Sequence, residues 1–227
     1  MAHTLVSARR VSRNFTLGTE TVHALRNVDL DLLAREIVLI EGKSGSGKTT
    51  LLNLMGGLDT PTEGDVMFRG QNLASYSRRR LADWRRTTVG FVFQSFALIE
   101  GLTAFENVDT AARIGGLKPS VAQTRSYEML GRVGLKGRAS HRIAELSGGE
   151  QQRVALARGL VCDREVVFAD EPTGELDHAT SRWVLDFLRE IVDERKTTIC
   201  LTSHDPAVIR FADRVYRLED GSMVESN

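Results

Sequence analysis

The chain has 227 residues, of which 41% are hydrophobic and 26% charged, and its 30 basic residues equal its 30 acidic ones. This composition is typical of a globular protein with one sizeable core, and zero net charge argues against a general nucleic-acid-binding surface. No apolar run reaches the roughly 18–20 residues that cross a bilayer, and the N-terminus has no signal-peptide pattern. We therefore expect any membrane role to come through a partner.

The two cysteines, Cys162 and Cys200, lie far apart and belong to no CxxC motif. No pair of histidines lies near them either. We expect both to be buried and reduced, and neither to form a disulfide or a metal site.

Short, nearly continuous apolar runs alternate with helical patterns along much of the chain. The expected strands are 37–40, 89–93, 166–169, 197–202 and 214–218. Apolar residues at helical spacing indicate a helix over 179–194. This alternation predicts an α/β fold with a mostly parallel sheet that helices cover on both faces.

Two regions depart from the alternation. In the N-terminal third, 21–32 and 64–73 have the pattern of antiparallel strands. The middle, 95–160, has only helical signals, including a T-x-x-E capping box at Thr103 and Glu106 and a second helix over 119–134. The basic run 77–86 is interpreted as a solvated helix face and not as a binding patch.

We therefore expect one domain over 1–227. Its parts are an α/β core with a β sub-domain, formed by 1–94 and 161–227, and an inserted helical sub-domain, 95–160. No internal repeat and no low-complexity linker is apparent.

Residues 42–49, "GKSGSGKT", fit G-x-x-x-x-G-K-[ST] between a predicted strand and a helix that stops at Gly56-Gly57. The glycines let successive N–H groups point at phosphate oxygens, and the helix start adds a positive dipole. Lys48 is placed for the β- and γ-phosphates and Thr49 for Mg²⁺. A dinucleotide fingerprint is disfavoured, because it has no lysine in its loop. The predicted ATP-binding residues here are Gly42, Lys43, Ser44, Gly45, Ser46, Gly47, Lys48, Thr49 and Thr50.

The buried run "VVFADEP" (166–172) ends in two carboxylates at the edge of the sheet where ligands bind. Asp170 suits the Mg²⁺ shell, and Glu171 can polarise an attacking water. The alternative is a strand that ends in a polar turn at Pro172. The phosphate loop favours the catalytic interpretation.

The run "LSGGE" (146–150) places two glycines in the first turn of a helix. Ser147 and Glu150 have the spacing of a capping box, so the helix begins there despite Gly148 and Gly149. Bare backbone at a helix start is an anion site that another group can approach closely.

Taken in order, "GKSGSGKT", "LSGGEQQR", "VVFADEP", "TGELD" and "TSHD" resemble the ATP-binding cassette (ABC) ATPases over essentially the whole chain. The resemblance implies a P-loop NTPase (RecA-like) core. It also implies that Phe15 stacks on adenine and that Gln94 senses Mg²⁺ and γ-phosphate and couples to the transporter. Asp177 would contact the opposite subunit, and His204 would hold the γ-phosphate and the attacking water.

The resemblance further implies a head-to-tail, ATP-dependent homodimer in which Ser147, Gly148, Gly149 and Glu150 act on ATP held by the other copy. Lys48, Glu171 and His204 would be catalytic, with ATP and Mg²⁺ bound. The cassette would sit in the cytoplasm on the inner face of the cell membrane, through a separate permease subunit and without nucleic acid. The branch it most resembles contains lipoprotein-releasing, macrolide-export, haem-export, bacitracin-resistance and cell-division ATPases.

Several positions depart from the pattern of that branch. Glu175 replaces the usual asparagine, and Ala34-Arg35 replace a usual glycine before Glu36. Glu100 and Ile143 stand where prolines are common. No departure removes a catalytic group, so we expect a competent ATPase.

Three rival functions follow from the same signature. Chromosome-maintenance or DNA-repair ATPases carry long heptad segments between phosphate loop and signature, which this chain lacks. Translation-factor types have two cassettes in one chain, and this chain has one. A regulatory ATPase that controls a membrane or cell-wall partner without transport stays open, as does the identity of any transported substrate.

Overall fold

The computed structural model describes residues 3–174 and 176–224. Within them lie two sheets and six α-helices. The strands are β1 (Thr4–Leu17), β2 (Glu20–Leu33), β3 (Ile37–Glu41), β4 (Glu63–Phe68), β5 (Gln71–Asn72), β6 (Val89–Val92), β7 (Val166–Ala169), β8 (Thr198–Ser203), β9 (Arg214–Glu219) and β10 (Ser222–Val224). The helices are α1 (Lys48–Met55), α2 (Arg78–Thr88), α3 (Ala104–Ile114), α4 (Pro119–Arg132), α5 (Gly148–Leu160) and α6 (His178–Arg195).

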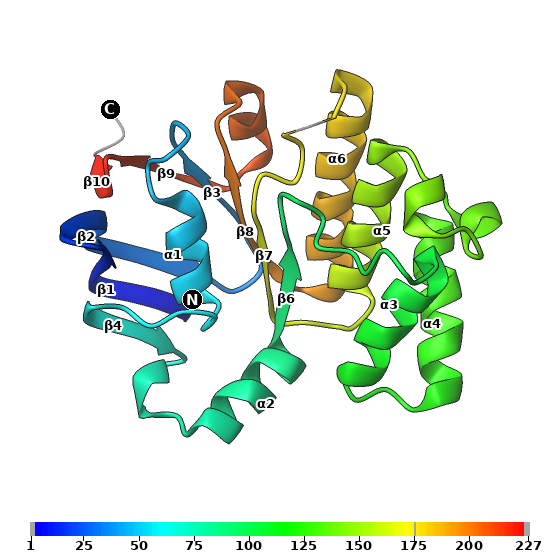
Figure 1. The fold of residues 1–227 in the computed structure, drawn as a ribbon, viewed down its shortest axis with the longest axis horizontal. Helices are drawn as coiled ribbons and strands as arrows, with labels where there is room; N and C mark the ends of the chain where they lie inside the picture. The colour runs from blue at the N-terminus through cyan, green and yellow to red at the C-terminus, as the bar shows by residue number, and fades with distance from the viewer. Residues whose placement is uncertain (1–2, 175, 225–227) are drawn as a thin grey trace.

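The larger sheet has the order β10-β9-β3-β8-β7-β6, and all its pairings are parallel except that of β10 with β9. The smaller sheet, β2-β1-β4-β5, is antiparallel. Figure 1 shows the smaller sheet and α1 on one side of the molecule, and α3, α4 and α5 together on the other side. The predicted α/β class, with an antiparallel N-terminal sheet and a helical insertion, is confirmed.

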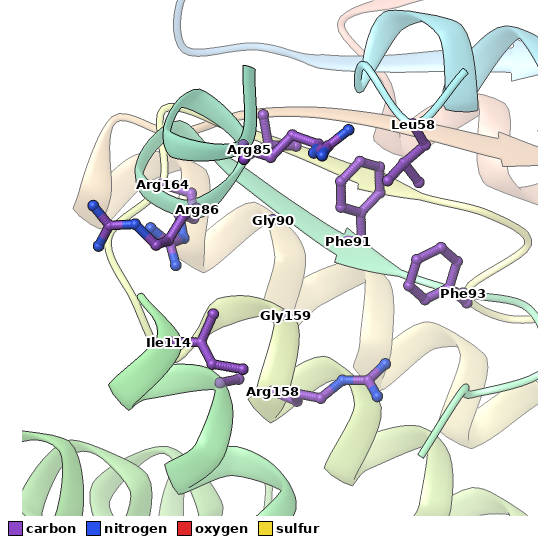
Figure 2. Close-up of a pocket in the computed structure, with 13 residues that line it drawn as sticks. Leu58, Arg85, Arg86, Gly90, Phe91, Phe93, Ile114, Arg158, Gly159 and Arg164 are labelled. Atoms are coloured by element: carbon purple, nitrogen blue, oxygen red, sulfur yellow. The ribbon is translucent and has the colours of Figure 1, made fainter. Parts of the chain in front are cut away.

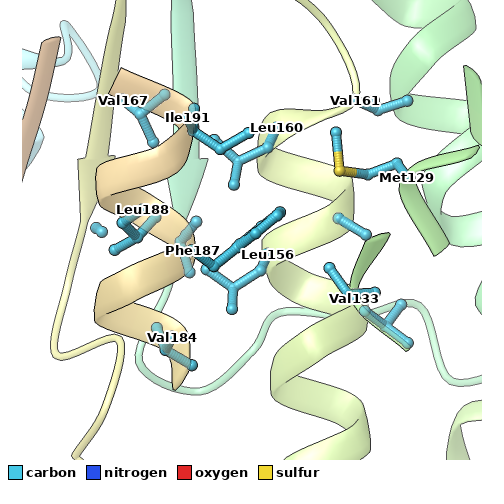
Figure 3. Packing of buried hydrophobic residues seen from close by; sticks show 14 of the residues in the cluster. Met129, Val133, Leu156, Leu160, Val161, Val167, Val184, Phe187, Leu188 and Ile191 are labelled. Atoms are coloured by element: carbon cyan, nitrogen blue, oxygen red, sulfur yellow. The ribbon is translucent and has the colours of Figure 1, made fainter. Parts of the chain in front are cut away.

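The central parallel strands β3 and β7 are buried along nearly their whole length because each of their faces meets a different core. Val38 and Ile40 of β3 pack into the cluster formed with α1 and the antiparallel sheet. Ile37 and Leu39, on the opposite face, pack into the cluster formed with α3 to α6. In this second cluster Phe187 of α6 lies against Leu156 of α5 (Figure 3).

The second cluster includes residues of both the core and the helical insertion, so α5 packs between the two. Figure 3 shows α5 with α6 on one side and Met129 and Val133 on the other. The division of the chain at 95 and 160 stays a prediction.

The N-terminal sheet differs in detail from the expectation. The segments 21–32 and 64–73 form antiparallel strands as expected, and β2 and β4 both pair with β1, while β5 pairs with β4. Strand β1 has no clear sequence signal, because register shifts interrupt its alternation and Arg10 has a positive φ of 47°. This strand and the short strand β10 are elements that sequence reasoning missed.

Local signals elsewhere predicted the elements well. Helix α3 begins with the capping box of Thr103 and Glu106, with both reciprocal hydrogen bonds present. Helix α1 ends at Met55, directly before the two glycines. Both cysteines are free and buried, as expected. Within the described residues, no helix has the length and apolar character needed to cross a bilayer.

Candidate functional site

The phosphate loop lies between the end of β3 and the start of α1. Gly47 is the N-cap of α1 with φ 104°. A Cβ there would lie 2.5 Å from the carbonyl oxygen of Ala24, so both backbone conformation and space require glycine. At Gly42, a Cβ would lie 2.4 Å from the carbonyl oxygen of Leu218. The glycines therefore let the loop pack tightly against its surroundings.

Lys48 is buried at the centre of this loop. Its Nζ donates hydrogen bonds to the carbonyl oxygens of Gly42 (2.8 Å) and Lys43 (3.0 Å). The same ammonium lies 3.3 Å from Glu171 Oε1, and both side chains are less than a tenth exposed. Loop and acidic strand end are therefore linked by an ion pair that is shielded from water.

Asp170 connects the loop to β8. Its Oδ2 accepts a hydrogen bond from Thr49 Oγ1 (2.7 Å), and its Oδ1 accepts one from Thr202 Oγ1 (2.7 Å). A hydroxyl and a carboxylate side by side offer the oxygen ligands that Mg²⁺ prefers. No group of three or more His, Cys, Asp or Glu is arranged as a metal site in the described part of the chain. These few donors fit Mg²⁺ held jointly with substrate phosphates, as is usual for this ion.

Glu171 is placed by contacts on three sides. Its backbone N–H donates to Thr202 Oγ1 (2.9 Å), and its φ of 45° is in the left-handed region. Its Oε2 lies 3.0 Å from Nδ1 of His204, whose side chain is 61% exposed. Left-handed backbone at a non-glycine residue costs of order 1–3 kcal/mol and clusters at active sites. Thr202, which donates to the Asp170 carboxylate and accepts from the Glu171 N–H, was missed because its contacts join strands distant in sequence.

These groups surround a pocket of about 330 Å³. The predicted residues that line it are Ser44, Gly45, Gly47, Lys48, Thr49, Thr50, Gln94, Glu171 and His204. Three residues of β2, Val22, His23 and Ala24, complete the lining and were not predicted. Gly42, Lys43 and Ser46 do not line the pocket, and Asp170 is linked to it through its hydrogen bond with Thr49.

Phe15 does not line this pocket. It pairs with Val22 across the β1–β2 ladder, and the guanidinium of Arg13 lies 4.5 Å from the centre of its ring. Val22 is 41% exposed and belongs to the lining. The stacking of adenine on Phe15 stays a prediction, with Val22 as the neighbouring apolar surface.

The signature residues form a separate surface at the start of α5. Ser147 is the N-cap, and its hydroxyl accepts a hydrogen bond from the Glu150 N–H (3.3 Å). Glu150 Oε2 accepts from the Ser147 N–H (2.9 Å), and this bond, more than that from the Ser147 hydroxyl, lowers the pKa of Glu150. A Cβ on Gly148 or Gly149 would meet no atom within 4 Å in the described residues. Neither glycine has a positive φ, so backbone freedom does not explain them.

Asp177 has a role within its own chain. Its carboxylate is the N-cap of α6, accepting from the N–H groups of Ala179 (3.0 Å) and Thr180 (3.1 Å). The hydrogen bond from the Thr180 hydroxyl is the largest cause that lowers the pKa of Asp177. Its predicted contact with an opposite subunit stays a prediction.

One departure from the family pattern, Arg35, lies in a turn whose geometry the structure describes. Arg35 adopts φ 70° where a glycine is usual, and its N–H donates to Thr198 Oγ1 (2.8 Å). The turn thus accepts a strained residue and fixes it to β8. Glu175, which replaces the usual asparagine, lies outside the described residues.

A groove of about 380 Å³ lies between α2, β6, α3 and α5 (Figure 2). It is lined by apolar side chains, and Ile114 is 63% exposed at its edge. Its charged lining residues are all arginines, namely Arg85, Arg86, Arg158 and Arg164. Sequence reasoning did not find this groove, because its residues come from four separate segments.

The site geometry defines a class of protein, one that binds a nucleotide phosphate at a P-loop beside an acidic strand end, and comparisons with known proteins name the family. A model of the ABC transporter family matches residues 25–174. The chain belongs to this family. The prediction that the chain is a member of the ABC family is confirmed.

Individual relatives agree with this assignment. The lipoprotein-releasing system ATP-binding protein LolD of Pseudomonas syringae pv. tomato is 42% identical over 222 residues, 98% of each chain. The macrolide export ATP-binding/permease protein MacB of Escherichia coli is 43% identical over 220 residues. These span 97% of this chain and 34% of MacB, so the chain covers about a third of the length of the MacB proteins it matches. The dimeric post-hydrolysis structure of the ATP-binding cassette MJ0796 with ADP and Pi has a TM-score of 0.92 at 36% identity, covering 98% of each chain.

Proposed function

We propose that the pocket at the phosphate loop binds ATP with Mg²⁺ and that the chain uses its hydrolysis to drive a separate membrane subunit. The observation that carries this proposal is the convergence of Lys48, Asp170, Glu171 and His204 on one pocket. Each is fixed by hydrogen bonds or an ion pair, so little reorganisation is needed for charge stabilisation.

The residues divide the work by position. Thr49 and Asp170 would hold Mg²⁺ with Gln94, and the ion would neutralise charge on the phosphates. Lys48 would exchange its contact with Glu171 for phosphate oxygens. That exchange frees the Glu171 carboxylate to polarise the attacking water, while the exposed His204 remains within reach of the γ-phosphate.

The signature residues Ser147 to Glu150 would complete the site from a second copy. They do not line the pocket of their own chain, and the space beside Gly148 and Gly149 is open. A head-to-tail dimer would place this helix start against the γ-phosphate held by the partner. Asp177, on the exposed start of α6, would lie at the same interface.

The groove of Figure 2 suits the membrane subunit. Its apolar floor, with Phe91 and Phe93, would take an apolar helix face. Its arginines favour a docking segment that carries carboxylates. This contact would hold the cassette peripherally on the inner face of the membrane and link ATP-driven dimerisation to export or mechanical transmission. The transported molecule would be selected by the membrane subunit.

The test is nucleotide binding and phosphate release by the purified chain and by Glu171→Gln. Glu171→Gln should bind Mg-ATP as tightly as the wild type but release phosphate about 10²–10⁴-fold more slowly, the range expected for a general base. Phosphate release at the wild-type rate would contradict the role of Glu171. Loss of ATP binding would indicate a structural role instead.

A further inference from the structure

Arg158, near the end of α5, holds the segment that follows Gln94. Its Nη2 donates to the carbonyl oxygen of Phe96 (2.8 Å), and its Nη1 donates to that of Ala97. The guanidinium is half-buried where it makes these contacts. One planar group thus fixes two successive peptide units.

The segment that Arg158 holds has an unusual backbone. Phe96 and Ala97 have φ values of 58° and 49°, and neither is a glycine. The Phe96 N–H donates to the Phe93 carbonyl oxygen (3.0 Å), which closes a turn that contains Gln94. Two successive left-handed residues persist only where surrounding contacts enforce them. Arg158 supplies such contacts by donating to the carbonyl oxygens of both residues.

The segment is also attached at its far end. The side chain of Asn107, on α3, accepts from the Ile99 N–H (2.8 Å) and donates to the Ile99 carbonyl oxygen (3.1 Å). By contrast, the Gln94 side chain is exposed and makes no hydrogen bond with the described residues. The direction of Gln94 therefore depends on the backbone that Arg158 and Asn107 hold.

We infer that Arg158 is a positioning residue that aims Gln94 into the ATP pocket and joins it to the signature helix. The inference rests on the proposed function, in which Gln94 contacts Mg²⁺ and the γ-phosphate. Helix α5 begins with the signature at Ser147 and carries Arg158 near its other end, so a rigid helix connects the two. Arg158 also lines the groove proposed for the membrane subunit (Figure 2).

The alternative is that Arg158 only stabilises the fold, as Arg195 does. Arg195 Nη1 donates to the carbonyl oxygen of Leu160, the last residue of α5 (2.6 Å). Burial is the largest influence on both guanidinium groups and lowers the pKa of each. Arg195 lies outside the lining of the ATP pocket and the groove, so Arg195→Met is a matched control.

The experiment is a double-mutant cycle in the full chain with Gln94→Ala, Arg158→Met and the double variant. The measurements are kcat, KM for ATP, the Mg²⁺ concentration that gives half-maximal rate and, without turnover, the Mg²⁺ dependence of binding of a non-hydrolysable ATP analogue. Arg158→Met should lower kcat about 10–10²-fold, the range for a misplaced catalytic group, and raise the Mg²⁺ requirement with little change in KM. The double variant should be no slower than the slower single variant, because both changes remove the same contact. Arg195→Met should stay within twofold of the wild type.

Two outcomes would overturn this inference alone. In the first, the losses of kcat in the two single variants multiply in the double variant. In the second, Gln94→Ala is slow but Arg158→Met keeps the wild-type kcat and Mg²⁺ requirement. Wild-type kinetics for Gln94→Ala would overturn the proposed role of Gln94 and this inference with it. If Arg158→Met does not fold, Arg158→Lys replaces it in the cycle, because lysine keeps the alkyl stem and one donor group. The same non-additivity is then expected with a smaller loss of kcat.

Discussion

The ATP pocket and the start of α5 differ in how far one copy of the chain completes them. Around the pocket, Lys48, Asp170, Glu171 and His204 contact residues of their own chain at hydrogen-bond or ion-pair distance. At the start of α5, Ser147 and Glu150 satisfy each other, while Gly148 and Gly149 face open space. The first region is assembled by folding, and the second has an open surface at which we propose that a second copy binds.

The glycines of the two regions show the same difference. Gly47 has φ 104° and no room for a Cβ, so the fold of a single copy requires it. Gly149 has neither constraint within its own chain. Since glycine in a helix weakens folding, its presence there agrees with the proposed contact with a second copy.

The largest expected loss of ATP affinity comes from replacing Lys48 in the ATP pocket. Lys48→Met removes the ammonium that would bind phosphate and leaves the Glu171 carboxylate buried without its cation. ATP affinity should fall about 10–10²-fold, as for the loss of charge-assisted hydrogen bonds of about 1.5–3 kcal/mol. Titration of the variant with a fluorescent ATP analogue measures this. Lys136→Met, outside the pocket lining, is the control, and equal affinities for the two variants would contradict the assignment.

Gly47→Ala tests the folding requirement directly. The alanine must adopt φ 104° and place its Cβ against the Ala24 carbonyl oxygen. The free energy of unfolding should fall by about 1–3 kcal/mol, the cost of strained backbone, and ATP binding should weaken as the loop shifts. Urea denaturation measures the stability. An unchanged midpoint would show that the loop does not need glycine there.

Gly149→Ala should act in the opposite direction on stability and by less. With helical φ and open space for the Cβ, alanine should raise the free energy of unfolding by about 0.5 kcal/mol. The same Cβ should weaken ATP-dependent association, because it stands on the approach surface. Urea denaturation measures the change in stability, and sedimentation velocity measures the change in ATP-dependent association. If Gly149→Ala instead lowered the stability of the monomer, Gly149 would be required for folding as Gly47 is, and the difference between the two regions would be lost.

Much of the fold and of the candidate site could be predicted from local sequence patterns. The phosphate loop, the acidic strand end and the capping boxes at Thr103 and Ser147 are short-range features whose residues determine their own geometry. Thr202, which bonds both Asp170 and the Glu171 N–H, and the arginine-lined groove depend on the packing of distant segments. Sequence periodicity contains no signal for them.

Strand β1 and Phe15 illustrate a second limit. Irregular register along β1 removes the alternation that identifies a strand, so its course follows from pairing with β2 and β4. The same pairing places Val22 in the pocket lining and Phe15 outside it. Phe15 and Val22 are direct partners across the ladder and share one face of the sheet, yet only Val22 lines the pocket, so the role of an aromatic residue on an irregular strand cannot be predicted from its position alone.

The measurement that tests the central claim most directly is ATP-dependent dimerisation of Glu171→Gln with and without Gly149→Asp, by sedimentation velocity at saturating Mg-ATP. Glu171→Gln alone should form dimers with ATP, because it binds the nucleotide without turning it over. The double variant should bind ATP equally well and remain monomeric, since a carboxylate on the approach surface repels the γ-phosphate of the partner. Dimers of the double variant with ATP would contradict the claim that the signature of one copy completes the active site of the other.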